Sequence, residues 1–538
     1  MARLPRSGPL LAAVLTALLI LAFAWPLPLH FGSRILGPTQ ADFYGIAWGL
    51  DHVARELFAG HWPVLHTTAL EFPRGTRLLV ADLPEAVLLA PVTRLFGPTA
   101  AFNLLALGHH ALAAAAAWWC ARRLGLAPPG RAITALAFAF APAFVGTTFN
   151  QNPDVTAWYW VPLAAGLAGT AGSARAAAGA GLVAGLAAWC NPYAGVMAAT
   201  AAVLLLPGRA LGRWAAMLGA LLFVGGGAAL LAWWAVKDPL SAGHKPGGLL
   251  ALHGAATLRD FFDPWPQIHV NREWTISRFM HPAYLGWSLL LFGAAGCARG
   301  RRWRWALLAL AGVLMAFGPR IGLTEDRALI NPVWWLGGHL GLDRLWLYHR
   351  YTALAALGLG LLAGGLADAL GRRGWWLVPL VALDLLILSP AWKYLGSVER
   401  FDDGACALLR ELPAGPQFDV PPGEHELWLF GGACSGNPVA AGINRPNSRF
   451  LNLVLSTAQT HGAPAALAAL RQQGFRYIVY HPGGPRGPLL DPGTLLALPC
   501  EVAGNEAGVK VLDISDCPAN LPRPLPVPQR TAASGDRF

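Results

Sequence analysis

Residues 100–121 have the sequence AAFNLLALGHHALAAAAAWWCA and are followed at once by Arg122 and Arg123. No Asp, Glu, Lys or Arg interrupts this run, which is as long as the ~20 residues that an α-helix needs to cross the hydrocarbon core of a bilayer. In lipid such a segment forms a helix, because a helix satisfies its own backbone N–H and C=O groups. The run therefore predicts a membrane-spanning helix with arginines at its end.

Comparable apolar segments recur along most of the chain. Hydrophobic residues make up 55% of the sequence and charged residues 13%, and the mean hydropathy is +0.44, which is more apolar side chain than a soluble globule can bury. The sequence predicts an α-helical polytopic membrane protein with about eleven transmembrane helices. The segments that join 100–121 are 8–29, 132–149, 155–170, 176–190, 193–207, 214–236, 283–298, 305–318, 347–370 and 374–391.

The loops between these segments differ in charge from one side of the membrane to the other. When alternate loops are assigned to one side, that side carries arginine without Asp or Glu, and the other side collects carboxylates. Under the positive-inside rule the arginine side is cytoplasmic, which leaves the long loops 30–99, 237–282 and 319–346 in the periplasm of a bacterial inner membrane. The arginines are Arg122, Arg123, Arg131, Arg175, Arg209, Arg213, Arg299, Arg301, Arg302, Arg304, Arg372 and Arg373.

The N-terminus is expected in the cytoplasm, because Arg3 and Arg6 precede the first apolar run. The alternative is a cleaved signal peptide, since Ala22-Phe23-Ala24 resembles a cleavage site. In both cases the residues that follow are outside. The net charge of +11 is spread over short clusters between apolar segments, a placement that argues against nucleic acid as a partner.

The composition changes after Trp392 to a mixed, polar and Pro/Gly-rich sequence. Within it, residues 463–473 predict a helix and Phe475–Tyr480 a strand, so residues 393–520 are expected to form a small periplasmic α+β domain after a membrane domain at 1–392. Its four cysteines, Cys406, Cys434, Cys500 and Cys517, permit two disulfides, although buried free thiols are an equal alternative. Residues 521–538, rich in Pro, are expected to lack fixed structure.

The first outer loop contains the first candidate site residue. Residues 42–59 have apolar side chains at helical spacing and predict an amphipathic helix along the membrane surface. Asp42 begins this helix. It is either an N-cap that accepts backbone N–H bonds or, at the outer membrane boundary, a general base that accepts a proton from an acceptor hydroxyl.

Three further carboxylates are candidates for holding an acceptor. Asp82 and Glu85 are three residues apart and can face one way on a helical turn; the alternative is capping of the apolar segment 84–97, which is short, broken by prolines and expected to be interfacial or re-entrant. Asp154 follows an outer turn, where it serves either the turn or a ligand. With no Asp-X-Asp motif, no metal or other cofactor is expected, and a divalent cation finds little support.

Other polar groups fall into two classes. His349 and Arg350, at the outer entrance of the segment 347–370, can bind a phosphate or pyrophosphate, or can instead reach to lipid headgroups. Asp368 and Asp384 lie inside predicted spans and are interpreted as structural, as is Asn191 in a tight outer turn. The sequence lacks a phosphate-binding Gly-rich loop, a His-Glu-X-X-His motif and a nucleophile elbow.

With these segments in order, the chain resembles the GT-C superfamily of multipass glycosyltransferases, and within it bacterial proteins similar to dolichyl-phosphate-mannose-type mannosyltransferases. The stretches that carry the resemblance are Ala41-Asp42, Phe72-Pro73-Arg74-Gly75, Phe102-Asn103-Leu104-Leu105, Ala121-Arg122-Arg123-Leu124, Ala141-Pro142 to Asp154, His281 to Gly286, Tyr348-His349-Arg350-Tyr351 and Gln473-Gly474-Phe475-Arg476-Tyr477. The resemblance implies transfer of a sugar from a polyprenyl-phosphate carrier on the periplasmic side, with a first-loop Asp that aligns with Asp42. Many members have an adjacent acidic pair there, whereas this chain has Phe43.

Two functional hypotheses follow. The first is a metal-independent, inverting glycosyltransferase of hexosyltransferase type, with a polyprenyl-phosphate-linked sugar as donor and a glycan, lipid or protein as acceptor. In it Asp42 is the base, Asp82, Glu85 or Asp154 orients the acceptor, and His349 and Arg350 hold the donor phosphate. The second is a non-catalytic transporter or scaffold that binds lipid-linked envelope glycans.

Overall fold

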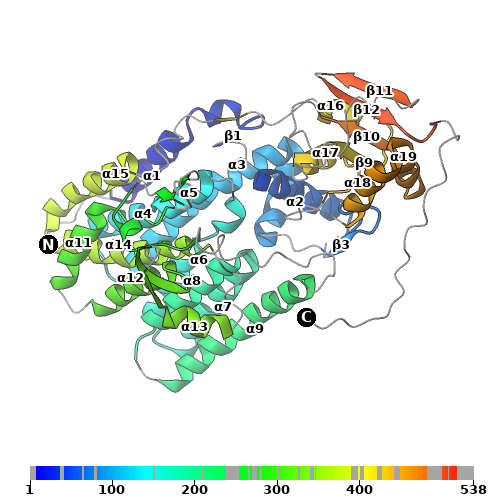
Figure 1. Ribbon diagram of the computed structural model, residues 1–538. Coiled ribbons are helices and arrows are strands. Elements are labelled where there is room, and N and C mark those ends of the chain that lie inside the picture. Colours follow the sequence, from blue (N-terminus) through cyan, green and yellow to red (C-terminus); the bar gives the residue numbers. More distant parts are fainter. Residues whose placement is uncertain are drawn as a thin grey trace. The chain divides into compact units, whose positions relative to one another are not determined.

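The computed structural model describes residues 8–36, 41–62, 66–77, 82–149, 152–208, 210–236, 254–264, 267–269, 275–277, 282–299, 302–324, 327–339, 345, 347–388, 398–399, 405–420, 427–441, 449–481, 500–506 and 508–517. The chain forms two compact units (Figure 1). One, here called the membrane unit, comprises residues 1–64, 79–237 and 242–401; the other, the C-terminal unit, comprises 65–78, 238–241 and 402–538. The predicted tail at 521–538 and the His281 of the resemblance lie outside the described residues.

Most helices of the membrane unit fall in the predicted apolar segments. The bounds of its helices are α1 (Gly8–Ala24), α2 (Ala41–Phe58), α3 (Leu83–Arg123), α4 (Pro128–Ala139), α5 (Pro142–Phe149), α6 (Trp160–Gly169), α7 (Ala174–Cys190), α8 (Pro192–Leu205), α9 (Leu211–Val236), α11 (Trp287–Ala298), α12 (Trp303–Ala316), α13 (Pro332–His339), α14 (Thr352–Ala369) and α15 (Leu377–Ile387). Helices α2 and α13 lie instead in the predicted outer loops 30–99 and 319–346. Short 3-10 turns join several of them, among them η2 (Pro153–Val155), η3 (Arg259–Phe261) and η6 (Tyr348–Tyr351).

Within the described residues, three helical stretches are long and apolar enough to cross a membrane: α3, α9 and Tyr348–Ala369, which contains α14. A fourth is reached if α4 and α5, bent by 43°, form one span, and the other apolar helices are shorter. A mostly helical chain with helices fit to cross a membrane is therefore confirmed, but the count of about eleven spans is not. The predicted segment 132–149 is not one straight helix, because Pro142 has no N–H to continue the α4 ladder.

Helix α14 lies at the centre of this unit, packed against α4, α11 and α12. Glycine allows these helices to approach closely: a Cβ on Gly364 would overlap the backbone of Gly130, and a Cβ on Gly130 would overlap Gly364. By contrast α9 exposes large apolar side chains, such as Leu222, Phe223 and Trp233. Such a surface is compatible with lipid, which solvates apolar side chains.

The two carboxylates inside predicted spans are structural, as the sequence indicated. Asp368 on α14 accepts hydrogen bonds from the backbone N–H groups of Ala127 (2.7 Å) and Gly130 (3.2 Å), at the N-terminus of α4. Asp384 on α15 accepts the N–H of Ser288 (2.6 Å), in the first turn of α11. Each therefore caps a neighbouring helix, because the first N–H groups of a helix have no partner within it.

The C-terminal unit is an α+β fold around a four-stranded sheet, with strand order β11-β12-β10-β9. Strands β9 (Gln417–Val420) and β10 (Tyr477–Tyr480) are parallel, whereas β12 (Val509–Asp513) runs antiparallel to β10 and to β11 (Glu501–Glu506). The helices are α16 (Ala405–Glu411), α17 (Leu427–Ser435), α18 (Arg449–His461) and α19 (Ala463–Gln472). The predicted helix and strand at 463–480 are confirmed, with α19 and β10 in their places.

Disulfides join Cys406 to Cys434 and Cys500 to Cys517, so of the two alternatives for these four cysteines the structure has the disulfides and not free thiols.

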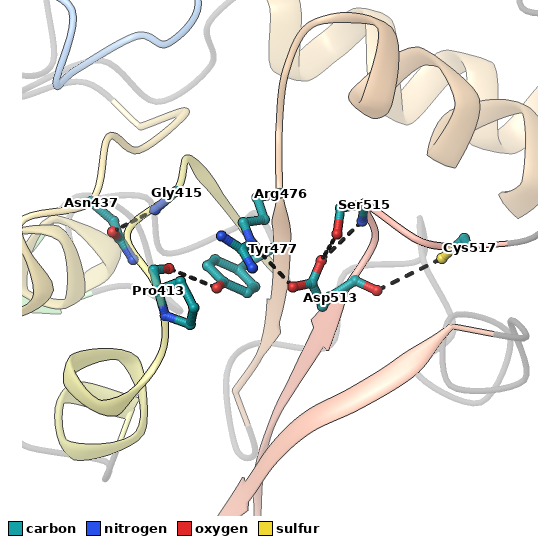
Figure 2. A network of polar contacts seen from close by, with 8 residues as sticks. All are labelled: Pro413, Gly415, Asn437, Arg476, Tyr477, Asp513, Ser515 and Cys517. Carbon is teal, nitrogen blue, oxygen red and sulfur yellow. Dashed lines mark hydrogen bonds and ion pairs between the residues drawn. The ribbon is translucent and has the colours of Figure 1, made fainter.

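Figure 2 shows the polar network at the start of β10: the Arg476 guanidinium donates to Asp513 (3.1 Å), and the Tyr477 hydroxyl donates to the Pro413 carbonyl (2.7 Å). Burial alone would raise the pKa of Asp513, but hydrogen bonds from Ser515 and Arg476 outweigh it and lower the pKa. The stabilisation from these bonds is therefore present at neutral pH and is lost as pH falls below 3.8.

This unit also contains a piece of the first outer loop. Strands β2 (His66–Thr67) and β3 (Thr76–Arg77) form a small antiparallel hairpin that belongs to the C-terminal unit and lies beside its helices in Figure 1. From the sequence, this stretch was expected to be part of the membrane domain. A hydropathy pattern does not indicate to which unit a short polar hairpin docks.

Candidate functional site

Asp82 immediately precedes α3 and has a left-handed backbone, with φ 51° and ψ 35°. Its N–H donates to the carbonyl of Cys190 at 2.9 Å, which fixes the start of α3 against the end of α7. Although it occupies the N-cap position, its side chain makes no capping hydrogen bond. The Asp82 side chain therefore does not cap α3, which was the structural alternative for this carboxylate.

The carboxylate of Asp82 is enclosed. The residue is 2% exposed, and both side-chain oxygens are buried without a hydrogen-bond partner in the described part of the chain. Burial raises the pKa of Asp82 well above its ordinary value, and the nearby carboxylates of Glu85 and Asp154 raise it further. A buried carboxylate with empty acceptor positions is costly, so it is a natural place for a ligand that donates hydrogen bonds.

Glu85 lies one turn further along α3 and is also buried. Its Oε1 accepts a hydrogen bond of 2.6 Å from the hydroxyl of Tyr159, which directly precedes α6. Because Asp82, Glu85 and Asp154 are electrostatic neighbours, the structure brings together all three residues that the sequence proposed for an acceptor. We call these three residues the acid cluster.

The next outer turn connects the acid cluster to α8. The Asn191 side-chain amide donates to the Asp154 carbonyl (3.3 Å), and its oxygen accepts the N–H groups of Tyr193 (2.8 Å) and Ala194 (3.3 Å). Asn191 is thus the N-cap of α8, which confirms its interpretation as a structural turn residue.

Tyr193 leads from this cap to the predicted phosphate-binding pair. Its hydroxyl accepts the N–H of Leu347 (3.1 Å), and its ring lies under the guanidinium of Arg350, with 4.8 Å from Cζ to the ring centroid. Arg350 and His349 are 4% and 2% exposed on η6. Direct contacts therefore connect the acid cluster to the cation, through Asp154, Asn191, Tyr193 and Arg350 in that order.

Asp42 lies in the first turn of α2, as predicted, but its side chain lies outside what the structure describes. The adjacent Phe43 is buried and packs edge to face on Phe102 of α3, with ring centroids 4.8 Å apart. Further along α2, His52 stacks on Trp48 at 4.5 Å, and burial lowers the pKa of His52 to about 4, so it is neutral at physiological pH. Helix α2 is thus fixed to α3, while the role of Asp42 stays a prediction.

Tyr159 does not stand out from the sequence, and the sequence indicates no role for Tyr193. The available signal for the first was Trp158-Tyr159-Trp160, an aromatic triplet immediately after the outer turn that carries Asp154. A further acidic pair, Asp260 and Asp263 at η3, makes local contacts: Asp260 accepts the N–H of Thr257 (2.7 Å), and Asp263 pairs with Arg259 (3.1 Å). Among described residues, no group of three or more His, Cys, Asp or Glu could hold a metal ion.

No family model and no curated protein matches the chain. Its fold is nevertheless similar to solved structures. One is arabinofuranosyltransferase AftD from Mycobacteria, with a TM-score of 0.55 and 17% identity over 95% of this chain and 42% of that one. Another is the apo form of the oligosaccharyltransferase of Archaeoglobus fulgidus, with a TM-score of 0.50 and 13% identity over 89% of this chain and 70% of that one.

At these identities the likeness concerns the fold alone. Both structures are GT-C glycosyltransferases, so the chain shares its fold with members of the superfamily that its sequence resembles, and membership in that superfamily stays a prediction. It spans less than half the length of the AftD chain.

Proposed function

We propose that the chain is a periplasm-facing glycosyltransferase of the bacterial inner membrane, which moves a sugar, of hexosyl type, from a polyprenyl-phosphate-linked donor to an envelope acceptor. The observation that carries this proposal is the acid cluster, in which Asp82 and Glu85 are buried and the Asp82 carboxylate has no hydrogen-bond partner among the described residues. Contacts through Asn191 and Tyr193 join this cluster to Arg350. Carboxylates accept hydrogen bonds from hydroxyl groups, and a guanidinium pairs with phosphate.

The reaction we propose has a simple balance of bonds. An acceptor hydroxyl oxygen attacks the anomeric carbon of the sugar, its proton goes to Asp42, and the bond from that carbon to the carrier phosphate oxygen breaks. The products are the glycosylated acceptor and free polyprenyl phosphate. Attack opposite the leaving phosphate inverts the anomeric configuration.

The other residues have supporting roles. Arg350 and His349 offset the negative charge that develops on the leaving phosphate, and Asp82, Glu85 and Asp154 hold the hydroxyl groups of the acceptor. Preorganised groups of this kind stabilise a transition state more than they do in water, because little water is present to compete with them. No metal ion is part of this proposal.

The test is transfer from radiolabelled polyprenyl-phosphate sugars in washed membranes that contain the full chain. If Asp42 is the base, Asp42→Asn lowers the rate by about 10²–10⁴-fold, while Asp51→Asn leaves it unchanged. Asp51 is a matched control, because it lies on the same helix and its carboxylate forms an ion pair with Arg55 one turn further along (2.7 Å). Arg350→Lys is expected to raise the KM for the donor, since Lys lacks the planar fork.

Two outcomes would contradict the proposal in different ways. If Asp42→Asn transfers sugar as fast as the wild type, Asp42 is not the base. If the wild type transfers no sugar from any carrier but still binds the lipid-linked sugars, the chain is the scaffold or transporter of the second hypothesis.

A further inference from the structure

The hairpin of the first outer loop carries a tight turn at its tip, Glu71-Phe72-Pro73-Arg74-Gly75. The carbonyl of Glu71 accepts the N–H groups of Arg74 (3.0 Å) and Gly75 (3.2 Å). Gly75 has φ +70°, and a Cβ there would lie 2.7 Å from the Thr67 carbonyl oxygen of the opposite strand. The turn therefore requires glycine at this position, which gives a physical reason for a motif that the sequence only marked as a resemblance.

The turn is held by backbone hydrogen bonds to residues 439–441 of the C-terminal unit. Val439 donates to the Ala69 carbonyl (2.9 Å), Phe72 donates to the Val439 carbonyl (3.1 Å), and Glu71 donates to the Ala441 carbonyl (3.0 Å). Val439 in turn bridges to Gln417 of β9. The first outer loop thus extends the edge of the β9–β10 sheet, in the manner in which peptides add to an exposed strand.

Side chains complete the contact. The Phe72 ring packs edge to face on Phe475, with centroids 5.0 Å apart, and Phe475 packs in the same way on Phe418 of β9. Leu70, just before the turn, is 1% exposed. Hydrogen bonds and the aromatic contact of the partly buried Phe72 with the buried Phe475 together make this a specific docking surface rather than a loose loop.

We propose that the C-terminal unit is a clamp for the first outer loop and that Phe72 is a positioning residue for glycosyl transfer, an inference that rests on the proposed function. The hairpin stands in the chain between α2, which carries Asp42, and Asp82 of the acid cluster. Only residues 78–81 separate its last strand residue, Arg77, from Asp82, a connection that spans at most about 18 Å. The segment that leads into Asp82 therefore starts from a docked strand.

Docking is tested without reference to activity. A protease site inserted after Glu399 is cut in membranes that contain the full chain, after which the C-terminal fragment is held only by non-covalent contacts. The wild-type fragment is expected to stay with the washed membranes. Phe72→Ala is expected to release it, because loss of this partly buried phenyl ring weakens docking by about tenfold or more.

Two variants sharpen this experiment. Phe72→Leu keeps most of the apolar volume and should restore retention. Phe58→Ala is the control, because Phe58 belongs to the same outer loop but is 60% exposed at the end of α2. Release of the wild-type fragment, or equal retention with Phe72→Ala, would overturn the clamp.

The positioning role is measured separately, in the uncut protein. Phe72→Ala should raise the KM for the acceptor at least tenfold with a smaller change in the KM for the donor, and Phe72→Leu should restore the acceptor KM. Unchanged kinetics with lost retention would overturn the positioning role while leaving the docking in place. Absence of transfer by the wild type would count against the proposed function, and the retention result would still decide whether the clamp exists.

Discussion

At the scale of single residues, Asp82 pairs a left-handed backbone with a buried carboxylate that finds no hydrogen-bond donor among the described residues. Both features cost stability, and such costs are typical of functional sites. Asp82→Asn is therefore expected to lower transfer and yet raise stability by about 1–3 kcal/mol at neutral pH, because the amide cannot carry a charge.

The stability difference between Asp82→Asn and the wild type is expected to depend on pH. The pKa of Asp82 is raised in the folded protein. The contribution of protonated Asp82 to the free energy of unfolding is therefore fully present below the unfolded pKa and is lost as pH rises through the folded pKa. The advantage of Asp82→Asn should then grow with pH, as seen in thermal unfolding of detergent-purified protein from pH 4 to pH 8. A variant less stable than the wild type at every pH would show that a contact of Asp82 stabilises the fold.

The sequence indicated part of this site for a physical reason. Asp82, Glu85 and Asp154 stood out because carboxylates at a membrane boundary are costly and gather on the outer side. Tyr159 did not stand out, although its hydroxyl bonds to Glu85, because the two residues are 74 positions apart. Only helix packing brings them together, and spacing along the chain does not encode it.

At the scale of elements, the crossing of α4 and α14 depends on two glycines that face each other. A Cβ at Gly364 would overlap the backbone of Gly130, so Gly364→Val should cost at least about 1–3 kcal/mol through overpacking. Gly219→Ala on α9 is the matched control, because nothing lies within 4 Å of the added Cβ. Thermal unfolding followed by size-exclusion chromatography measures both, and equal stability of the two variants would contradict the tight crossing.

Hydropathy predicted where helices occur but not where they bend. The helix α3 runs from Leu83 to Arg123, and Gly97, with φ 86°, breaks it into two parts. The sequence separated residues 84–97 from 100–121 for a different reason, because it took the prolines of the first part as breaks, whereas Pro91 lies within the helix and the break is at Gly97. It placed 132–149 in one segment, because apolar composition carries no information about the hydrogen bond that Pro142 cannot make.

At the scale of the whole molecule, α3 itself predicts an orientation for the membrane unit. The part of α3 after Gly97 ends at Arg122 and Arg123, so it covers about 39 Å at 1.5 Å per residue. This length exceeds the ~30 Å hydrocarbon core. Asp82 and Glu85 precede the part that spans, whereas the arginines follow it, and the positive-inside rule then predicts that the acid cluster faces the periplasm.

Cysteine labelling in intact spheroplasts tests this orientation. His61→Cys places a thiol at an exposed position of the first outer loop, and Arg122→Cys places one at the exposed end of α3. A membrane-impermeant maleimide should label the first variant directly and the second only after permeabilisation. The parent chain gives the background, because Cys120 and Cys190 are buried and Cys297 is partly exposed. The reverse pattern would put the acid cluster on the cytoplasmic face, where a periplasmic acceptor cannot reach it, and would remove the proposed reaction together with the orientation.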